Sequence, residues 1–189
     1  MKAIFKLIKP EHWIKNLLIF APLIFSKSFF DQKLLTESFY SFFVFCILSS
    51  TIYIFNDICD HKSDKKNKFR LPSKPIANGE ITLNNAKIIL ITFLIISLLI
   101  LGLKPKILFI GLIFLVLNFL YSILLKKIFI IDIFAISISY LIRVYAGGIV
   151  ISVPISAWML ITVLTTAIFV VSMKRKKESE IVGYSSRKV

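Results

Sequence analysis

Cysteine and negative charge are scarce in this sequence. Its 189 residues include only two cysteines, Cys46 and Cys59, and neither has a partner at CxxC spacing. Two cysteines are too few for a disulfide-stapled scaffold, so we interpret both as small apolar fillers of helices. Charged residues make up only 18% of the chain, although Lys and Arg outnumber Asp and Glu by 24 to 10. Charge this sparse argues against a soluble basic protein that binds nucleic acid.

Hydrophobic residues are abundant instead. They form 57% of the chain, whereas ordinary soluble domains are about 45–50% apolar, and this excludes a disordered chain. A helix needs about 20 mostly apolar residues to cross a bilayer. The charge-poor runs therefore predict an all-α integral membrane protein. Its six expected transmembrane helices cover residues 14–30, 38–56, 88–103, 107–125, 128–150 and 155–173.

The first of these ranges is the weakest. It contains Lys15, Lys27 and Pro22, which interrupt its apolar character. It lacks an A-x-A-like cleavage site, so we expect it to be retained in the mature protein rather than removed as a signal peptide.

The basic residues are divided unequally between the predicted loops. The N-terminus, the 57–87 loop, Lys126-Lys127 and the C-terminal tail together hold 19 of the 24. By the positive-inside rule these segments are cytoplasmic. We therefore expect a multi-pass protein of the plasma (inner) membrane, with its N-terminus and its 57–87 loop in the cytoplasm. The same asymmetry explains the net charge of +14 without any nucleic-acid partner.

Oxygen-bearing side chains cluster where the second predicted span meets the cytoplasm. Asn56, Asp57, Asp60 and Asp64 lie within about 100° of one another on a helical wheel. Like charges placed in this way repel one another, so a helix gains nothing from them unless a cation is present. Mg²⁺ is typically held by one or two carboxylates together with substrate phosphates. The pattern predicts a Mg²⁺ site formed by these four side chains, the alternative being an acidic cap on a solvated helix end.

A basic segment follows the acidic one. Lys68, Arg70 and Lys74 lie in a stretch that also contains two prolines and a glycine, which predict a shaped loop rather than a helix. Arginine binds phosphate oxygens through a bidentate fork and lysine binds them as a point charge. By themselves these residues are ordinary cytoplasmic loop charge. Beside the acids they predict a site that holds Mg²⁺ and a diphosphate together.

These motifs resemble those of the UbiA-type intramembrane prenyltransferase superfamily. The matching residues are Asn56-Asp57-x-x-Asp60-x-x-x-Asp64 and Lys74-Pro75-Ile76-Ala77-Asn78-Gly79, the latter with Lys74 where R-P-[IL]-x-x-G has arginine. Lys9-Pro10-Glu11-His12-Trp13-Ile14-Lys15-Asn16 is similar to the R-P-x-x-W-x-K-N opening of one branch, which includes decaprenyl-phosphate phosphoribosyltransferase. Weaker matches are Tyr121-Ser122-Ile123-Leu124-Leu125-Lys126, Asp132, Arg143 with Ala146-Gly147-Gly148, and Lys174-Arg175-Lys176-Lys177-Glu178.

The resemblance implies a fold and an activity. The fold is a bundle of usually nine membrane helices around a central cavity, of which this chain would hold six, so we expect a piece that lacks the last helices. The activity is Mg²⁺-dependent transfer in which Asp57, Asp60 and Asp64 hold the metal against a diphosphate donor. In the favoured branch the donor is 5-phosphoribosyl diphosphate and the acceptor is a polyprenyl phosphate. Prenyl transfer to an aromatic acceptor, an inactive truncated chain and a non-enzymatic membrane partner remain as alternatives.

Further candidates for substrate binding lie within or beside the predicted spans. Asp132 and Arg143 are ionisable groups inside one span, which by default marks function. They are separated by about three helical turns and lie close to one face. Asp132 is a candidate for a second acidic site, for which no second carboxylate is seen. The remaining candidates are Lys15, Asn16, Tyr121 and Lys126.

Overall fold

The chain folds into helices throughout the part that the structure describes. The computed structural model covers residues 2–67 and 71–182. Its α-helices are α1 (Lys2–Ile8), α2 (Ala21–Phe25), α3 (Gln32–Lys66), α4 (Leu83–Gly102), α5 (Pro105–Ile123), α6 (Phe129–Ile151) and α7 (Ala157–Val182). Three 3₁₀ helices connect them: η1 (Pro10–Phe20), η2 (Leu71–Ser73) and η3 (Leu125–Lys127). No strand occurs in these ranges, and the expected all-α class is confirmed.

Five helices, α3 to α7, are long and apolar enough to cross a membrane. The first predicted span differs from them. In place of one α-helix over residues 14–30, η1 is followed directly by the short α2. Pro22 has no N–H, so the Leu18 carbonyl instead accepts from the N–H of Ala21, three residues on, which is the 3₁₀ pattern. The count of six spans therefore stays a prediction.

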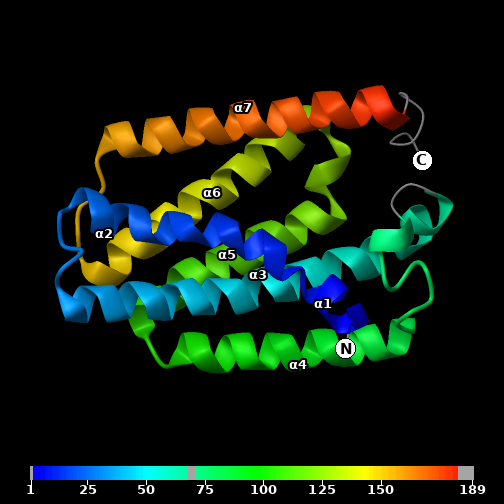
Figure 1. The fold of residues 1–189 in the computed structure, drawn as a ribbon, viewed down its shortest axis with the longest axis horizontal. Coiled ribbons are helices and arrows are strands. Elements are labelled where there is room, and N and C mark those ends of the chain that lie inside the picture. The colour runs from blue at the N-terminus through cyan, green and yellow to red at the C-terminus, as the bar shows by residue number, and fades with distance from the viewer. Residues whose placement is uncertain (1, 68–70, 183–189) are drawn as a thin grey trace.

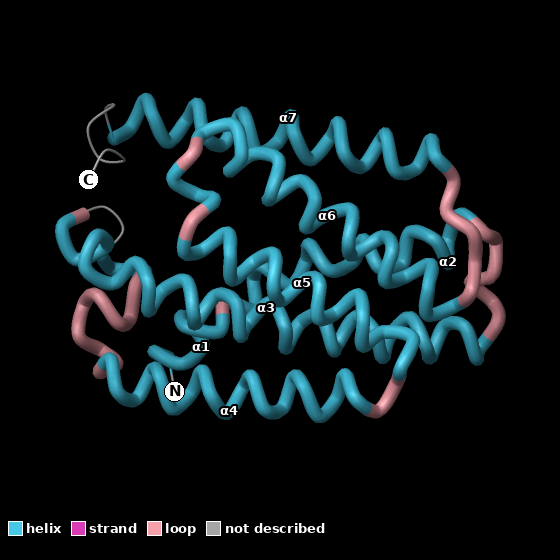
Figure 2. The backbone as a smooth tube through the Cα atoms, turned by 180° about the vertical axis from the view of Figure 1, so that it is seen from behind, coloured by secondary structure: helices cyan, strands magenta, loops and turns pink. Residues whose placement is uncertain are grey.

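The long helices lie side by side and alternate in direction. Figures 1 and 2 both place α4 and α7 on opposite sides of the bundle, with α3, α5 and α6 between them. The connection from α3 to α4, the turn from α5 to α6 and the C-terminal end of α7 lie at one end of the bundle (Figure 1). These are the segments that the positive-inside rule assigns to the cytoplasm, and we refer to this end as the polar end.

Local sequence signals fix where the helices begin. Asp31 precedes α3, and its Oδ1 accepts from the N–H groups of Lys33 at 2.9 Å and Leu34 at 3.1 Å. Thr82 caps α4 through its hydroxyl, which accepts from the N–H of Asn85 at 3.3 Å. Pro105 is the first residue of α5, where its missing N–H removes no helical hydrogen bond.

Two apolar clusters hold the polar side chains in place. The larger lies between α3, α5, α6 and the η1–α2 segment, with Leu101 of α4 also buried in it. A smaller one anchors the segment after α3 at the polar end, and its buried members are Leu7, Ile54, Ile76, Ile81 and Ala86. The η1 backbone also lies directly on α6, since a Cβ atom added at Gly147 would be 2.0 Å from the Ile19 carbonyl oxygen. Glycine permits this approach because it carries no side chain.

Candidate active site

The acidic motif lies on the last turns of α3. This helix continues to Lys66, so Asn56, Asp57, Asp60 and Asp64 follow one another on helical backbone at the polar end. Asp57 and Asp64 are buried, with exposed fractions of 2% and 5%. Carboxylates this deeply buried require compensating charge.

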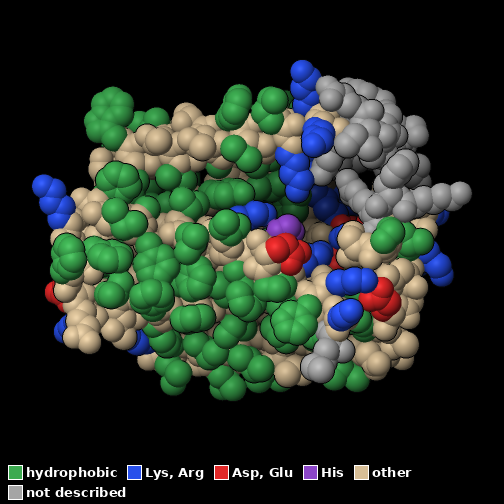
Figure 3. Space-filling view, in the orientation of Figure 1, with side chains coloured by type: hydrophobic (Ala, Val, Ile, Leu, Met, Phe, Trp, Pro, Cys, Tyr) green, Lys and Arg blue, Asp and Glu red, His purple; other side chains and the backbone are tan. Residues whose placement is uncertain are grey.

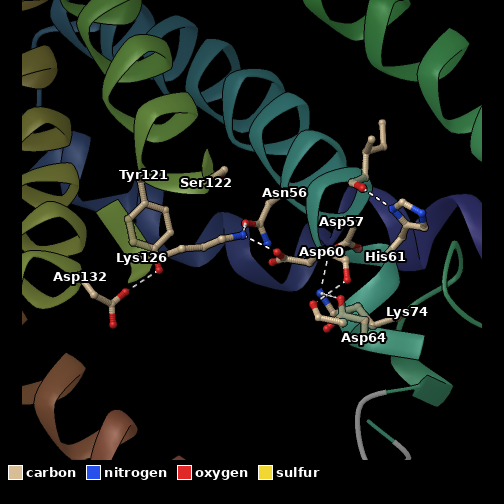
Figure 4. Close-up of polar contacts among 12 residues, drawn as sticks. Asn56, Asp57, Asp60, His61, Asp64, Lys74, Tyr121, Ser122, Lys126 and Asp132 are labelled. Carbon is tan, nitrogen blue, oxygen red and sulfur yellow. Dashed lines mark hydrogen bonds and ion pairs between the residues drawn. The ribbon is translucent and has the colours of Figure 1, made fainter. Parts of the chain in front are cut away.

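Two lysines from different segments compensate Asp57. Its Oδ1 atom is 2.7 Å from Lys9 Nζ and 2.6 Å from Lys74 Nζ. Lys74 Nζ is also 3.3 Å from Asp64 Oδ2 (Figure 4). Lys9 precedes η1 in the left-handed region, with φ of 53°. The N-terminal segment and the loop after α3 therefore meet at this one carboxylate.

The two lysines differ in how firmly they keep their protons. Burial lowers the pKa of Lys9 below its ordinary value, and the attraction of Asp57 does not fully offset this effect. Burial acts on Lys74 in the same direction, but Asp57 and Asp64 outweigh it and raise the pKa of Lys74. Lys74 is the more firmly charged of the two cations.

Lys126 compensates the charge of Asp60 in the same way that Lys9 and Lys74 compensate the charge of Asp57. It lies in η3, forms an ion pair with Asp60, and donates to Asn56 Oδ1 at 3.3 Å (Figure 4). His61 points away from the acids, because its Nδ1 is bonded to the Ile58 carbonyl at 2.7 Å. The predicted acids and two of the predicted basic residues are thus brought together.

A second acidic position lies beside this group. Asp132 on α6 is fully buried and accepts from the Tyr121 hydroxyl at 2.7 Å (Figure 4). Arg175 on α7 binds both oxygens of Asp132, with Nη2 to Oδ1 at 2.9 Å and Nε to Oδ2 at 2.6 Å. The Arg175 Nη2 is also 3.2 Å from the Tyr121 hydroxyl. Asp132 is therefore paired with Arg175 and not with Arg143.

Arg143 lies deeper in the bundle. Its Nε donates to Asn16 Oδ1 at 2.7 Å, and its Nη1 donates to the Ser139 carbonyl at 2.6 Å. Lys15, the neighbour of Asn16 on η1, is half-buried. Of the predicted substrate-binding residues, Asn16 and Arg143 contact each other, whereas Lys68 and Arg70 lie outside the described residues.

The residues of the acidic motif fit a cation, although lysines now occupy much of their surface. Within residues 2–67 and 71–182, no three His, Cys, Asp or Glu side chains are close enough to form a metal-binding group. The Oδ2 atom of Asp57, however, is buried and has no hydrogen-bond partner in that part of the chain. A buried carboxylate oxygen without a partner is costly, and it is a ligand that Mg²⁺ prefers.

Two residues of this site were missed as individual candidates. Lys9 appeared only as the first residue of the N-terminal motif, and Arg175 only as one member of a basic run. Neither carries a sequence signal that distinguishes it from other cytoplasmic charge. Their roles depend on contacts over 48 and 43 positions, to Asp57 and Asp132 respectively.

The fold and the polar end define an all-helical membrane protein with an acidic motif surrounded by lysines, and comparison with known proteins gives its family. The UbiA prenyltransferase family model matches residues 19–186, so the chain belongs to this family. A curated relative, the decaprenyl-phosphate phosphoribosyltransferase of Mycobacterium tuberculosis, is 28% identical over 98% of this chain. The match covers 64% of that relative, so the chain spans less than two thirds of its length.

Solved structures agree on the fold. A UbiA homolog from Archaeoglobus fulgidus bound to DMAPP and Mg²⁺ superposes with a TM-score of 0.69 and 18% identity, covering 87% of this chain and 60% of that one. A digeranylgeranylglyceryl phosphate synthase gives a TM-score of 0.70 and 23% identity, covering 98% of this chain and 70% of that one. At these identities the likeness shows the fold alone.

Proposed function

We propose that this chain is a membrane transferase that moves a 5-phosphoribosyl group from 5-phosphoribosyl diphosphate to a polyprenyl phosphate, with Mg²⁺, at the cytoplasmic face of the plasma membrane. The observation that carries the proposal is the joint placement of Asp57, Asp60 and Asp64 with Lys9, Lys74 and Lys126 at one end of the bundle. Such a site offers oxygen ligands to a cation and ammonium groups to a diphosphate. The choice of donor and acceptor is supported by the name of the curated relative and by the N-terminal motif.

The reaction places negative charge on the leaving diphosphate, and the site contains groups that can neutralise it. The bond between the anomeric carbon and the diphosphate oxygen breaks, and a phosphate oxygen of the acceptor bonds to that carbon. The acidic motif would hold Mg²⁺, which supplies Lewis-acid neutralisation of the leaving diphosphate. Lys74 and Lys126, now bound to carboxylates, would bind diphosphate oxygens and neutralise the same charge. A phosphate acceptor is already ionised, so the reaction needs little help from a general base.

Prenyl transfer to an aromatic acceptor is the second candidate. It is favoured by the family's description and by the prenyl diphosphate in the Archaeoglobus fulgidus structure. An aromatic acceptor needs more activation than a phosphate. The nearest acids are engaged by cations, since Asp57 binds Lys9 and Lys74 while Asp60 binds Lys126. When the donor binds, these acids would exchange their lysines for Mg²⁺, so none would be free to act as a general base, which favours the phosphate acceptor.

A transfer assay in membranes tests the proposal. Radiolabelled 5-phosphoribosyl diphosphate, Mg²⁺ and decaprenyl phosphate are supplied, and label in the lipid phase is counted with and without chelator. We expect chelator-sensitive label, and we expect Asp60→Ala to reduce it by at least about a hundredfold. Glu80→Ala is the matched control, because Glu80 is an exposed acid that pairs with Lys6 outside the site.

The donor arms separate the two candidates. Label transferred from a prenyl diphosphate to an aromatic acid, with none from the ribosyl donor, would establish the second candidate in place of the first. Full activity in Asp60→Ala would refute the assignment of the acidic motif.

A further inference from the structure

A hollow lies between η1 and α7. Helix α6 packs against both of these elements. In the space-filling view the hollow is visible between them, and basic side chains gather toward its polar end (Figure 3). The acidic motif accounts for Lys9, Lys74 and Lys126, but not for the cations that lie deeper along η1 and α6.

The Arg143 guanidinium is the most deeply placed of these cations. Only 5% of the residue is exposed. The guanidinium lies over the Phe114 ring, 4.8 Å from its centre, and its Nε is held by Asn16. Among the described residues no carboxylate binds it, and Asn16 and Ser139 offer only neutral oxygens. A buried guanidinium without a counter-charge is costly, so an anion at this position would be bound favourably.

Lys15 adds a second uncompensated cation. It is half-buried and makes no hydrogen bond or ion pair within the described part of the chain. The charges that act on it are all positive: those of Arg143, Lys174 and Lys9, in that order of strength. Cations that repel one another in this way are held together by the fold, which is the arrangement expected of an anion site.

The N-terminal segment connects Lys15 to the acidic motif, because Lys9 immediately precedes η1 and Lys15 lies within it. In a 3₁₀ helix, side chains three positions apart lie one above the other, so His12 and Lys15 share one face of η1, whereas Lys9 precedes the helix in the left-handed region. At about 2 Å of rise per residue, Lys15 lies roughly 10 Å along the axis from Pro10, the first residue of η1. Lys9 binds Asp57 at the polar end. Because η1 runs from there toward α2, at the opposite end of the bundle, Lys15 lies deeper in the bundle than Lys9 (Figure 1).

We propose that Lys15 and Arg143, with Arg143 oriented by Asn16, bind the phosphate group of the lipid acceptor. The site rests on the proposed function in one respect, since it takes the acceptor to be a phosphomonoester. The shared chemistry is a phosphate dianion held by an ammonium and a guanidinium. Its two sources are a polyprenyl phosphate and free inorganic phosphate, which the experiment distinguishes.

Direct binding tests the site without any donor. The full chain in nanodiscs is titrated with fluorescent decaprenyl phosphate, and in parallel arms with decaprenol, which lacks the phosphate, and with inorganic phosphate as a competitor. We expect decaprenyl phosphate to bind at least about tenfold more tightly than decaprenol, since hydrogen bonds to charged groups contribute on this scale. We expect inorganic phosphate to compete only weakly, because it lacks the apolar chain whose burial adds to the affinity of the lipid.

Three test variants and one control variant separate binding from folding. Asn16→Asp places a carboxylate on Arg143 with almost no change of shape, so the chain should remain folded while phosphate affinity falls roughly ten- to a hundredfold. Lys15→Gln should lower the affinity by about tenfold, and Lys15→Arg should restore most of it. Lys33→Gln is the control, because Lys33 is exposed at the first turn of α3, far from the polar end.

The outcomes are decisive in both directions. Equal affinity for decaprenyl phosphate and decaprenol, or unchanged affinity in Asn16→Asp, would overturn the site. Inorganic phosphate that competes as well as the lipid would overturn the lipid source and leave a free-phosphate site. Failure of the proposed function would show differently: phosphate-selective lipid binding would persist, with no Mg²⁺-dependent transfer from the ribosyl donor.

Discussion

Replacing Gly147 by alanine should separate η1 from α6. The added Cβ would lie 2.0 Å from the Ile19 carbonyl oxygen and 2.9 Å from its carbon, and both are backbone atoms that no side-chain rotation can move. Contacts shorter than 3.0 Å essentially do not occur, so the two elements must separate by about 1 Å. Overpacking of this kind costs about 1–3 kcal/mol. The same shift would lengthen the Asn16–Arg143 hydrogen bond of 2.7 Å.

Cys46 provides a local reporter for this perturbation. Its thiol is buried and accepts a hydrogen bond from Asn16 Nδ2 at 3.4 Å, whereas the other cysteine, Cys59, is exposed. In a Cys59→Ser background, the rate at which a thiol-reactive dye labels Cys46 during heating therefore follows the opening of this interface. A cost of 1–3 kcal/mol corresponds to a fall in Tm of roughly 2–12 °C for a chain of this size.

Gly102→Ala is the matched control. Gly102 also lies in a helix, at the end of α4, but an added Cβ would meet no atom within 4 Å. There alanine should leave Tm unchanged or raise it slightly, because it is the better helix former. If Gly147→Ala behaved like Gly102→Ala, the close approach of η1 to α6 would be refuted, and with it the orientation of Arg143 by Asn16.

Further predictions concern charge pairs and ligands. Arg175→Gln should lower the free energy of unfolding by about 3–5 kcal/mol, because it leaves Asp132 buried without its arginine. In a double-mutant cycle followed by thermal unfolding, Arg175→Gln combined with Asp132→Asn should cost less than the sum of the two single changes. Lys104→Gln should cost no more than about 1 kcal/mol in the same assay, since its pair with Glu37 is partly exposed to solvent, and a larger loss would contradict this. Mg²⁺ or inorganic diphosphate alone should change Tm little, whereas both together should raise it by at least about 5 °C, because the acids and lysines of the site must exchange partners at the same time. A rise in Tm with Mg²⁺ alone that is as large as the rise with both ligands would contradict that coupling.

The acidic motif shows how far sequence patterns extend. The shared face of Asn56 to Asp64 was inferred by assuming helical geometry beyond the predicted span of residues 38–56, and α3 does continue through these residues to Lys66. Their lysine partners were not predicted in detail, because Lys9 and Lys126 reach the motif across 48 and 66 positions of sequence. Pairing over such separations depends on how the helices pack, which a periodicity does not contain.

The first predicted span shows that local backbone conformation can also escape a prediction from hydropathy. Hydropathy indicated a membrane segment over residues 14–30, but the backbone conformation there depends on single hydrogen bonds. The segment is the 3₁₀ helix η1 over Pro10–Phe20, and this conformation places His12 and Lys15 on one face. The alignment was invisible to an interpretation that assumed an α-helix.

The sequence by itself determined the features that depend on local composition: an all-α membrane protein, the acidic and basic motifs on one side of it, and the resemblance to its family. The length of an apolar run and the distribution of charge between loops are properties of the sequence itself, so they can be determined without coordinates. The tertiary structure alone decided which charges meet. Asp132 faces Arg175 and not Arg143, and Arg143 is left with the neutral Asn16, because the packing of η1 and α7 on α6 sets those distances.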